Sequence, residues 1–222
     1  MPVTPPGWRA PRRERTIPAM TDVLVLHAAL PGGDDAGLAA ALLAQLPYGR
    51  RLELERRDAA ARFASLAGIA LVLAGAARLC GRPAGVAQLR FPQDGKPSLA
   101  GGPWFSVSHS GRRVAVAVSE CSEVGLDLEE VPADASVRSR GRGSLERWTA
   151  TEAALKAVGA GVRAAGELQW SDDRSSATLA AAVIHLRSLA LAHDCVACLA
   201  TLAPVSEVTV VERAIQWPCG TG

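Results

Sequence analysis

The longest uncharged apolar run in the chain, residues 63–77, sets the strictest limit on its fold. This run contains two glycines, is bracketed by Arg62 and Arg78, and is shorter than the ~20 residues that span a bilayer. We therefore expect a buried helix and no membrane partner. Apolar residues make up 49% of the 222-residue chain, which is enough to bury a sizeable core.

Charge and cysteine content narrow the class of protein. The formal net charge of +2 is spread along the chain and gives no case for a nucleic-acid partner. The five cysteines are an odd number, too sparse for a disulfide scaffold, and no signal peptide precedes them. We expect a monomeric protein of the reducing cytoplasm.

Apolar periodicity predicts strands before and after the helices, an order that indicates an α+β fold with antiparallel strand pairing. The expected strands are residues 23–26, a hairpin at 104–118, and residues 124–129, 168–170, 177–183, 186–192, 195–202 and 208–211. The expected helices are residues 37–46, residues 52–79 as one helix or two, and a helix from Thr149 after a polar loop at 132–144. Residues 1–19 and 216–222 are expected to be tails.

The strand expected at 124–129 carries two carboxylates, Asp127 and Glu129, on one face because side chains alternate with period two. Spacing alone fits the solvated face of an edge strand. However, carboxylates ~7 Å apart repel each other unless a cation lies between them, and hard divalent cations prefer oxygen ligands. A third carboxylate nearby would complete a Mg²⁺ site, and Glu152 is the candidate.

Glu152 and Lys156 lie on the helix expected from Thr149, and they also have an ordinary interpretation. Thr149 and Glu152 fit a capping box, and Glu152 with Lys156 fits a surface pair worth ~0.3–0.5 kcal/mol. Against this, Lys96 and Lys156 are the only lysines among 24 Lys and Arg residues. A chain that uses Arg wherever a cation serves has kept Lys at these positions, and a helix N-terminus attracts phosphate. Both features favour a functional role.

Two other groups of side chains are weaker candidates. Ser108 and His109 are adjacent on a strand and point to opposite faces, and the chain has no Gly-x-Ser-x-Gly elbow, so a Ser-His hydrolase is disfavoured. A lone histidine is more often structural. Cys195 and Cys198 also face opposite sides of a strand and cannot share one metal ion, so we interpret them as structural.

Four blocks in this order carry a family resemblance: Gly-Lys-Pro at 95–97, Phe-Ser-Val-Ser-His-Ser-Gly at 105–111, Val-Gly-Leu-Asp-Leu-Glu at 124–129, and Trp-Thr-Ala-Thr-Glu-Ala-Ala-Leu-Lys-Ala at 148–157. Together they resemble the 4′-phosphopantetheinyl transferase superfamily, in particular its long, Sfp-type members. The resemblance implies two similar α+β halves, here residues 20–123 and 124–215, with the active site in the cleft between them.

The activity implied is transfer of the 4′-phosphopantetheine group of coenzyme A to a serine of an apo acyl or peptidyl carrier protein, as in holo-carrier-protein synthases. By position, Mg²⁺ would be held by Asp127, Glu129 and Glu152, and Glu152 would help to deprotonate the carrier serine. Catalysis would involve Asp127, Glu152 and Lys156. Coenzyme A would be bound by Lys156 and by four further residues, Lys96, Ser108, His109 and Arg62.

The chain departs from the family pattern in three ways. The helix position that commonly holds an Arg for the 3′-phosphate is Ala64 here, so Arg62 is the expected substitute. Thr151 stands where members usually have a Lys. Only 18 residues, 130–147, separate the acidic strand from the helix, where long members have a longer segment. A degenerate paralogue that binds coenzyme A or a carrier protein is therefore the alternative. The loop arginines Arg138, Arg140, Arg142 and Arg147 fit a carrier landing surface, and they fit equally well a solvated, flexible connection.

Overall fold

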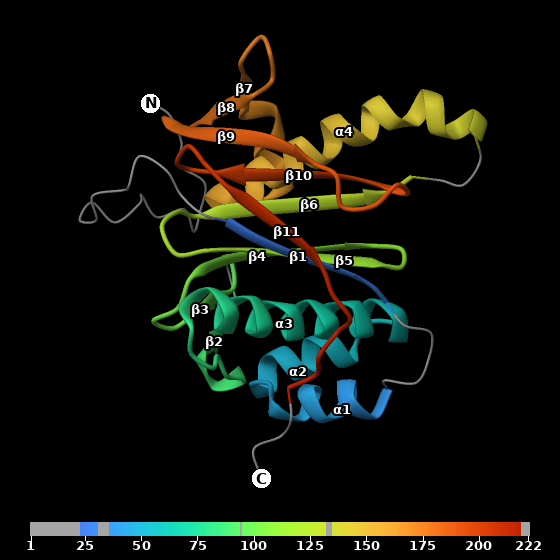
Figure 1. Cartoon of the computed structure of the whole chain (residues 1–222), viewed down its shortest axis with the longest axis vertical. Coiled ribbons are helices and arrows are strands. Elements are labelled where there is room, and N and C mark those ends of the chain that lie inside the picture. The colour runs from blue at the N-terminus through green and yellow to red at the C-terminus, as the bar shows by residue number, and fades with distance from the viewer. Residues whose placement is uncertain (1–22, 31–35, 94, 132–134, 219–222) are drawn as a thin grey trace.

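The structure is a computed structural model that describes residues 23–30, 36–93, 95–131 and 135–218. It has two main sheets, and helices cover the outer side of each (Figure 1). The expected α+β class is confirmed. The tail expected at residues 1–19 and the last residues, 219–222, lie outside the described part of the chain.

The first sheet has the strand order β11-β1-β5-β4. The strand β1 pairs antiparallel with β5 and parallel with β11, and β5 forms a hairpin with β4. Val, Leu and Ala residues dominate β1 and β5, and both strands are buried along nearly their whole length because both faces of the sheet are covered. The four strands are β1 (Val23–Ala29), β4 (Trp104–Ser110), β5 (Arg113–Ser119) and β11 (Val208–Glu212).

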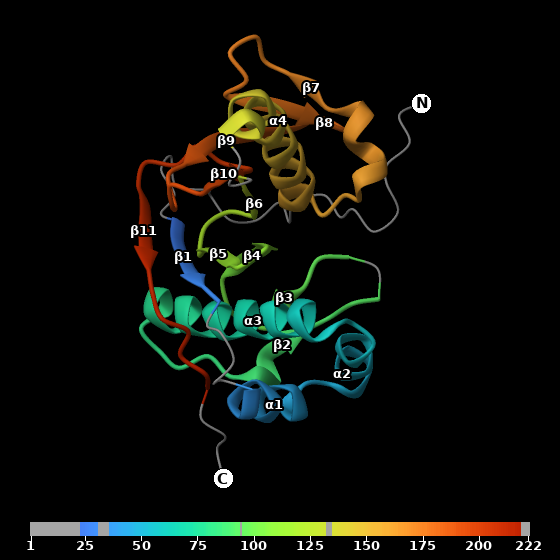
Figure 2. The same cartoon turned by 90° about the vertical axis from the view of Figure 1, so that its right-hand side faces the viewer.

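Three helices follow β1: α1 (Ala36–Gln45), α2 (Tyr48–Glu55) and α3 (Ala59–Cys80). The segment expected as one helix or two is two, because Asp58 caps the start of α3 by accepting the Ala61 N–H at 2.8 Å. The helix α3 lies between the sheet and the layer of α1 and α2 (Figures 1 and 2). A short 3₁₀ turn, η1 (Val86–Gln88), and a small pair of strands, β2 (Leu89–Arg90) and β3 (Ser98–Leu99), complete this region.

The helix α3 is long and apolar enough to cross a membrane by composition, but 67% of its most apolar window is buried inside the protein. This burial is typical of a core helix in a soluble protein, as expected from residues 63–77. Cytoplasmic localisation stays a prediction.

The second sheet has the order β6-β10-β9-β8-β7, with all its pairs antiparallel. Its strands are β6 (Val124–Glu130), β7 (Gln169–Trp170), β8 (Ser176–Leu179), β9 (Ala182–Leu189) and β10 (Cys195–Thr201). The helix α4 (Ala135–Val158) packs on β6, β9 and β10, and a 3₁₀ turn, η2 (Val162–Glu167), follows it. The strand expected at 177–183 is divided by a turn at Ala180 and Ala181.

The polar loop expected at 132–144 is largely helical, because α4 begins at Ala135 and not near Thr149. Thr149 therefore lies inside the helix, where its hydroxyl donates to the Glu146 carbonyl at 3.1 Å. The capping-box interpretation of Thr149 and Glu152 is wrong, and neither residue is near a helix N-terminus. Gly and Ser residues suggested a loop, whereas ion pairing of Arg142 with Glu146 one turn away supports the helix.

The last strand returns to the first sheet. Although β11 follows the second sheet in sequence, it pairs with β1, so the second half as an independent unit ends before Val208. Beyond β11, Trp217 is 9% exposed and packs edge-on against Phe63 of α3, with ring centroids 5.3 Å apart. The expectation of a tail from residue 216 therefore needs correction at one residue, because the Trp217 side chain belongs to the core of the first half.

Candidate functional site

The two sheets meet where the edge strands β4 and β6 lie side by side. Serine hydroxyls on β4 join the strands by accepting backbone N–H groups of β6. The serines are every second residue of β4, and their partners are every second residue of β6. The three bonds are Leu126 N to Ser106 Oγ (2.9 Å), Leu128 N to Ser108 Oγ (3.3 Å) and Glu130 N to Ser110 Oγ (3.2 Å). We call these three residues the serine ladder.

Asp127 lies beside this ladder and is 4% exposed. Its Oδ1 accepts the Ser108 hydroxyl at 2.8 Å and the Lys156 ammonium at 2.5 Å. Its Oδ2 is buried and has no hydrogen-bond partner among the residues that the structure describes. Because buried polar atoms are rarely left unpaired, this carboxylate oxygen is a candidate ligand for a cation.

The other two carboxylates of the predicted metal site are Glu129 and Glu152, and the charges of Asp127 and Glu129 both act on the pKa of Glu152. Glu129 accepts the Ser110 hydroxyl on Oε2 at 2.6 Å. The pKa of Glu152 is raised by desolvation and by the negative charges of Asp127 and Glu129, while Lys156 opposes the shift. All three carboxylates thus contribute to one local electrostatic field, and their shared Mg²⁺ site stays a prediction.

The arrangement nevertheless differs from an assembled metal centre. Among the described residues, no three His, Cys, Asp or Glu side chains are gathered so as to hold a metal ion. The positive charge among the carboxylates is the ammonium of Lys156, which reaches Asp127 from α4. The donor set suits Mg²⁺ chemically, since it consists of carboxylate oxygens and includes the unpaired Oδ2 of Asp127.

A pocket of about 540 Å³ lies next to this cluster and is lined from both halves of the chain. Of the residues predicted to bind coenzyme A, it contains Lys96, His109 and Lys156. Its other charged lining residues are Arg50 and Arg57. The lining thus has no carboxylate among the described residues, so the pocket favours an anionic ligand.

Both lysines of the chain line this one pocket. Lys96 donates to the Val124 carbonyl at the start of β6. Desolvation lowers its pKa to about 8, with Lys156 adding to the shift and Glu123 opposing it. The pKa of His109 is also lowered, by desolvation and by the positive charges of Arg57 and Lys156, so its imidazole is neutral near pH 7.

Two predicted coenzyme A residues do not line the pocket. The Ser108 hydroxyl is committed to the Asp127 carboxylate and the Leu128 N–H. Arg62 is half-buried on α3 and is not part of the lining, whereas Arg50 and Arg57 are. The arginines that line the pocket therefore lie on α2 and in the turn after it, whereas the family pattern placed such an arginine on α3.

The sequence reasoning missed Arg50 and Arg57, which Glu53 holds together through ion pairs of 2.5 and 2.7 Å. Desolvation opposes ionisation of Glu53, but the two arginines outweigh it and keep the pKa of its carboxyl below the ordinary value. Arg57 also donates to Ser65 of α3 at 3.0 Å, and the Arg50 guanidinium lies 5.0 Å from the centre of the Phe91 ring. The spacing of Arg and Glu by three and four residues was the available signal.

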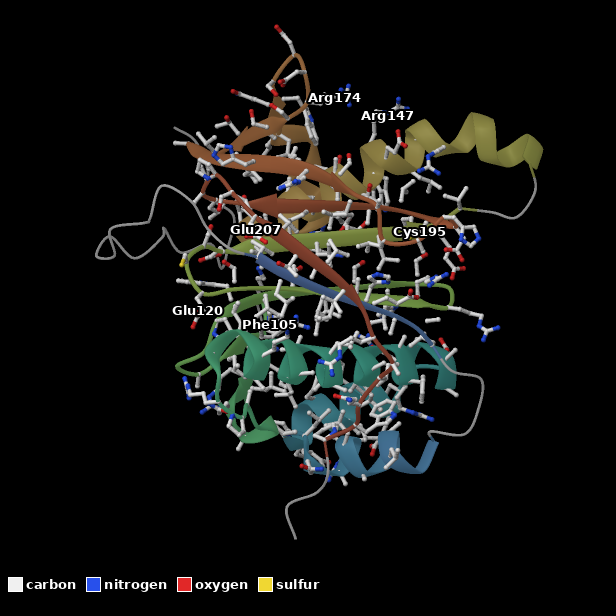
Figure 3. The ribbon with its side chains drawn as sticks, in the orientation of Figure 1. Phe105, Glu120, Arg147, Arg174, Cys195 and Glu207 are labelled. Carbon is white, nitrogen blue, oxygen red and sulfur yellow. The ribbon has the colours of Figure 1, made fainter. Side chains whose placement is uncertain are left out.

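No described cysteine lines the pocket, although Cys198 lies opposite Asp127 on the neighbouring strand. Cys195 and Cys198 are buried in β10, and burial raises the pKa of the Cys198 thiol to about 12. On α4, Arg147 is exposed and points outward, and Figure 3 shows it on the side of the helix away from the sheet.

No family model matches the chain, and no curated protein sequence matches it.

Proposed function

We propose that this protein is a Mg²⁺-dependent 4′-phosphopantetheinyl transferase that modifies a serine of an apo carrier protein with the phosphopantetheine group of coenzyme A. One observation carries the proposal: Lys156 lines the cationic pocket and also contacts Asp127 of the carboxylate cluster. Its position links a site for an anionic ligand with a site for a divalent cation. Phosphoryl transfer requires this combination, because it depends on positioning and charge neutralisation.

The topology supports two related halves. In the first half, β1 is followed by α3 and by the β4–β5 hairpin, whose second strand pairs antiparallel with β1. In the second half, β6 is followed by α4 and by β9 and β10, and β10 pairs antiparallel with β6. Each long helix packs on its own three strands. This correspondence agrees with the duplicated fold implied by the four sequence blocks.

The pocket supports coenzyme A as the ligand. Arg50, Arg57, Lys96 and Lys156 supply positive charge for its phosphates, while Phe91 and Phe105 supply apolar surface. The volume of about 540 Å³ is in the usual range for a small-molecule site and suits the nucleotide end of coenzyme A.

In the proposed reaction, the carrier serine oxygen attacks the phosphorus of the phosphopantetheine arm, and the bond to the leaving adenosine 3′,5′-bisphosphate breaks. Glu152 takes the serine proton, a role favoured by its raised pKa. Lys156 binds the phosphates and neutralises charge on the leaving group. Bound Mg²⁺, held by Asp127, Glu129 and Glu152, would supply further positive charge to the pyrophosphate.

The ion pair of Lys156 with Asp127 favours a second candidate function. If this pair persists when the pocket is filled, the carboxylates stay neutralised and the protein binds coenzyme A or a carrier protein without transfer. Coenzyme A binding alone does not distinguish the two functions, whereas turnover does.

The test is mass spectrometry of several apo carrier proteins incubated with coenzyme A, Mg²⁺ and the protein. We expect one phosphopantetheine group per carrier, and Asp127→Asn should lower the rate by roughly 10²-fold or more because it removes charge from the reacting centre. Asp173→Asn is the matched control, since Asp173 is exposed in a turn outside the site. Coenzyme A binding with no modified carrier would support the binding module, and unchanged turnover in Asp127→Asn would refute the proposed metal site.

A further inference from the structure

The members of the serine ladder make the same backbone bond but have different second partners. Ser108 and Ser110 each accept an N–H of β6 and also donate to the carboxylate of the preceding β6 residue. These carboxylates belong to Asp127 and Glu129. Ser106 accepts its N–H in the same way, but the preceding β6 residue there is Gly125, which has no side chain.

We propose that Ser108 and Ser110 are positioning residues, which orient Asp127 and Glu129 for a divalent cation. The proposal rests on the proposed function and changes the role expected for Ser108, from contacting coenzyme A phosphates to orienting a carboxylate. It adds Ser110 to the site.

The chemistry of a hydroxyl explains the arrangement. A serine has one O–H donor, and its oxygen accepts other donors at the same time. Once the oxygen of Ser108 accepts the Leu128 N–H, its proton is directed to Oδ1 of Asp127 at 2.8 Å. One carboxylate oxygen is thereby fixed, and Oδ2 is left buried without a partner. Groups that orient metal ligands in this way typically change metal affinity by ~10–100-fold.

The simpler interpretation is that the ladder only joins the two sheets. Ser106 separates the two interpretations, because it is 4% exposed, makes the shortest of the three backbone bonds at 2.9 Å, and touches no carboxylate. If joining the sheets were the whole role, loss of any of the three hydroxyls would affect the site alike.

The experiment compares Ser106→Ala, Ser108→Ala and Ser110→Ala in the full-length protein. Mn²⁺ binding is measured by electron paramagnetic resonance without coenzyme A, because Ser106 also lines the pocket proposed for coenzyme A. Folding is checked by circular dichroism and urea unfolding. We expect Ser108→Ala and Ser110→Ala to weaken Mn²⁺ binding by roughly 10-fold or more, and Ser106→Ala to change it by less than about twofold. All three should lower the unfolding midpoint similarly. Ser110→Thr, which keeps the hydroxyl, should restore binding.

Equal loss of Mn²⁺ affinity in all three alanine variants would overturn the proposal, and so would unchanged affinity in Ser108→Ala and Ser110→Ala. If Ser108→Ala does not fold, Ser110→Ala decides the question, because Ser110 is only half-buried. Wild-type protein that binds Mn²⁺ while Ser110→Ala binds it equally well refutes the positioning role and leaves the proposed function standing. Wild-type protein that binds no Mn²⁺ refutes the metal site and the positioning role together.

Discussion

Both long helices pack closely on their sheets, but the glycines that allow the close approach lie on the helix in one half and on a strand in the other. In the first half the small residues are on the helix: Gly68 and Gly75 of α3 face the side chains of Val107 and Val118. In the second half the small residue is on the strand, because Gly125 of β6 faces the backbone of α4. A side chain can move to relieve a collision, but a helix backbone moves only as a whole. We therefore expect the first half to tolerate a larger residue at these glycines better than the second half does.

The difference extends to the distribution of charge. Between Arg62 and Arg78, α3 has no charged side chain, and it is covered by the sheet on one side and by α1 and α2 on the other (Figure 2). The helix α4 has one buried face and one exposed face, and Glu152 and Lys156 are half-buried where these faces meet. The first half thus supplies most of the pocket wall, and the second half supplies the carboxylates and Lys156.

Gly125→Ala should have the largest effect on this arrangement. A Cβ at this position would lie 1.9 Å from the Ala153 carbonyl oxygen and 2.5 Å from the Ala157 nitrogen. The helix that carries Glu152 and Lys156 would have to move, so we expect a loss of about 3 kcal/mol or more in unfolding free energy. Urea unfolding measures it. Gly37→Ala is the control, because no described atom lies within 4 Å of a Cβ there. Equal stability of the two variants would contradict the prediction.

Gly75→Ala should cost less, although its Cβ would also be crowded. The nearest atom would be Cγ2 of Val118 at 2.9 Å, a side-chain atom that can shift. Alanine also gains about 1 kcal/mol over glycine inside a helix, which offsets part of the strain. We expect a net loss of about 1 kcal/mol in the same urea titration. A loss of stability as large as that of Gly125→Ala would contradict the prediction. It would show that a new Cβ costs as much against a side chain as against a helix backbone.

An effect of opposite sign, and no larger than that of Gly75→Ala, is expected at the turn between β8 and β9. Ala180 and Ala181 have positive φ angles of 49° and 68°, which alanine adopts at a cost. In the first half the turn after β4 has Gly111 at φ 50°, which also leaves room for the Glu130 carboxylate. Replacing both alanines as Ala180→Asn with Ala181→Gly should raise stability by about 1 kcal/mol. Thermal unfolding would show an increased Tm, and a decreased Tm would contradict the strain.

Short-range patterns predicted most strands and part of the site. Alternation in residues 124–129 correctly placed Asp127 and Glu129 on one strand. The scarcity of lysine drew attention to Lys96 and Lys156, which line one pocket, and their functional role stays a prediction. These features depend on local geometry or on composition, which the sequence shows directly.

Features that depend on distant contacts were not predictable. Arg50 and Arg57 become pocket residues only because α2 packs near the loop around Lys96. The start of α4 was misread because Gly141 and Gly143 weaken its helical pattern. The pairing of β11 with β1 depends on tertiary folding and leaves no local signal.

The return of β11 has a consequence for the order in which a newly made chain folds. Val23 of β1 pairs with Val208, so one edge of β1 has no partner until β11 has been synthesised and has left the ribosome. Pairings between such distant segments form slowly, and an unpaired strand edge promotes aggregation. The half that is synthesised first is therefore completed last, and β1 is the segment that a nascent chain most needs to have shielded.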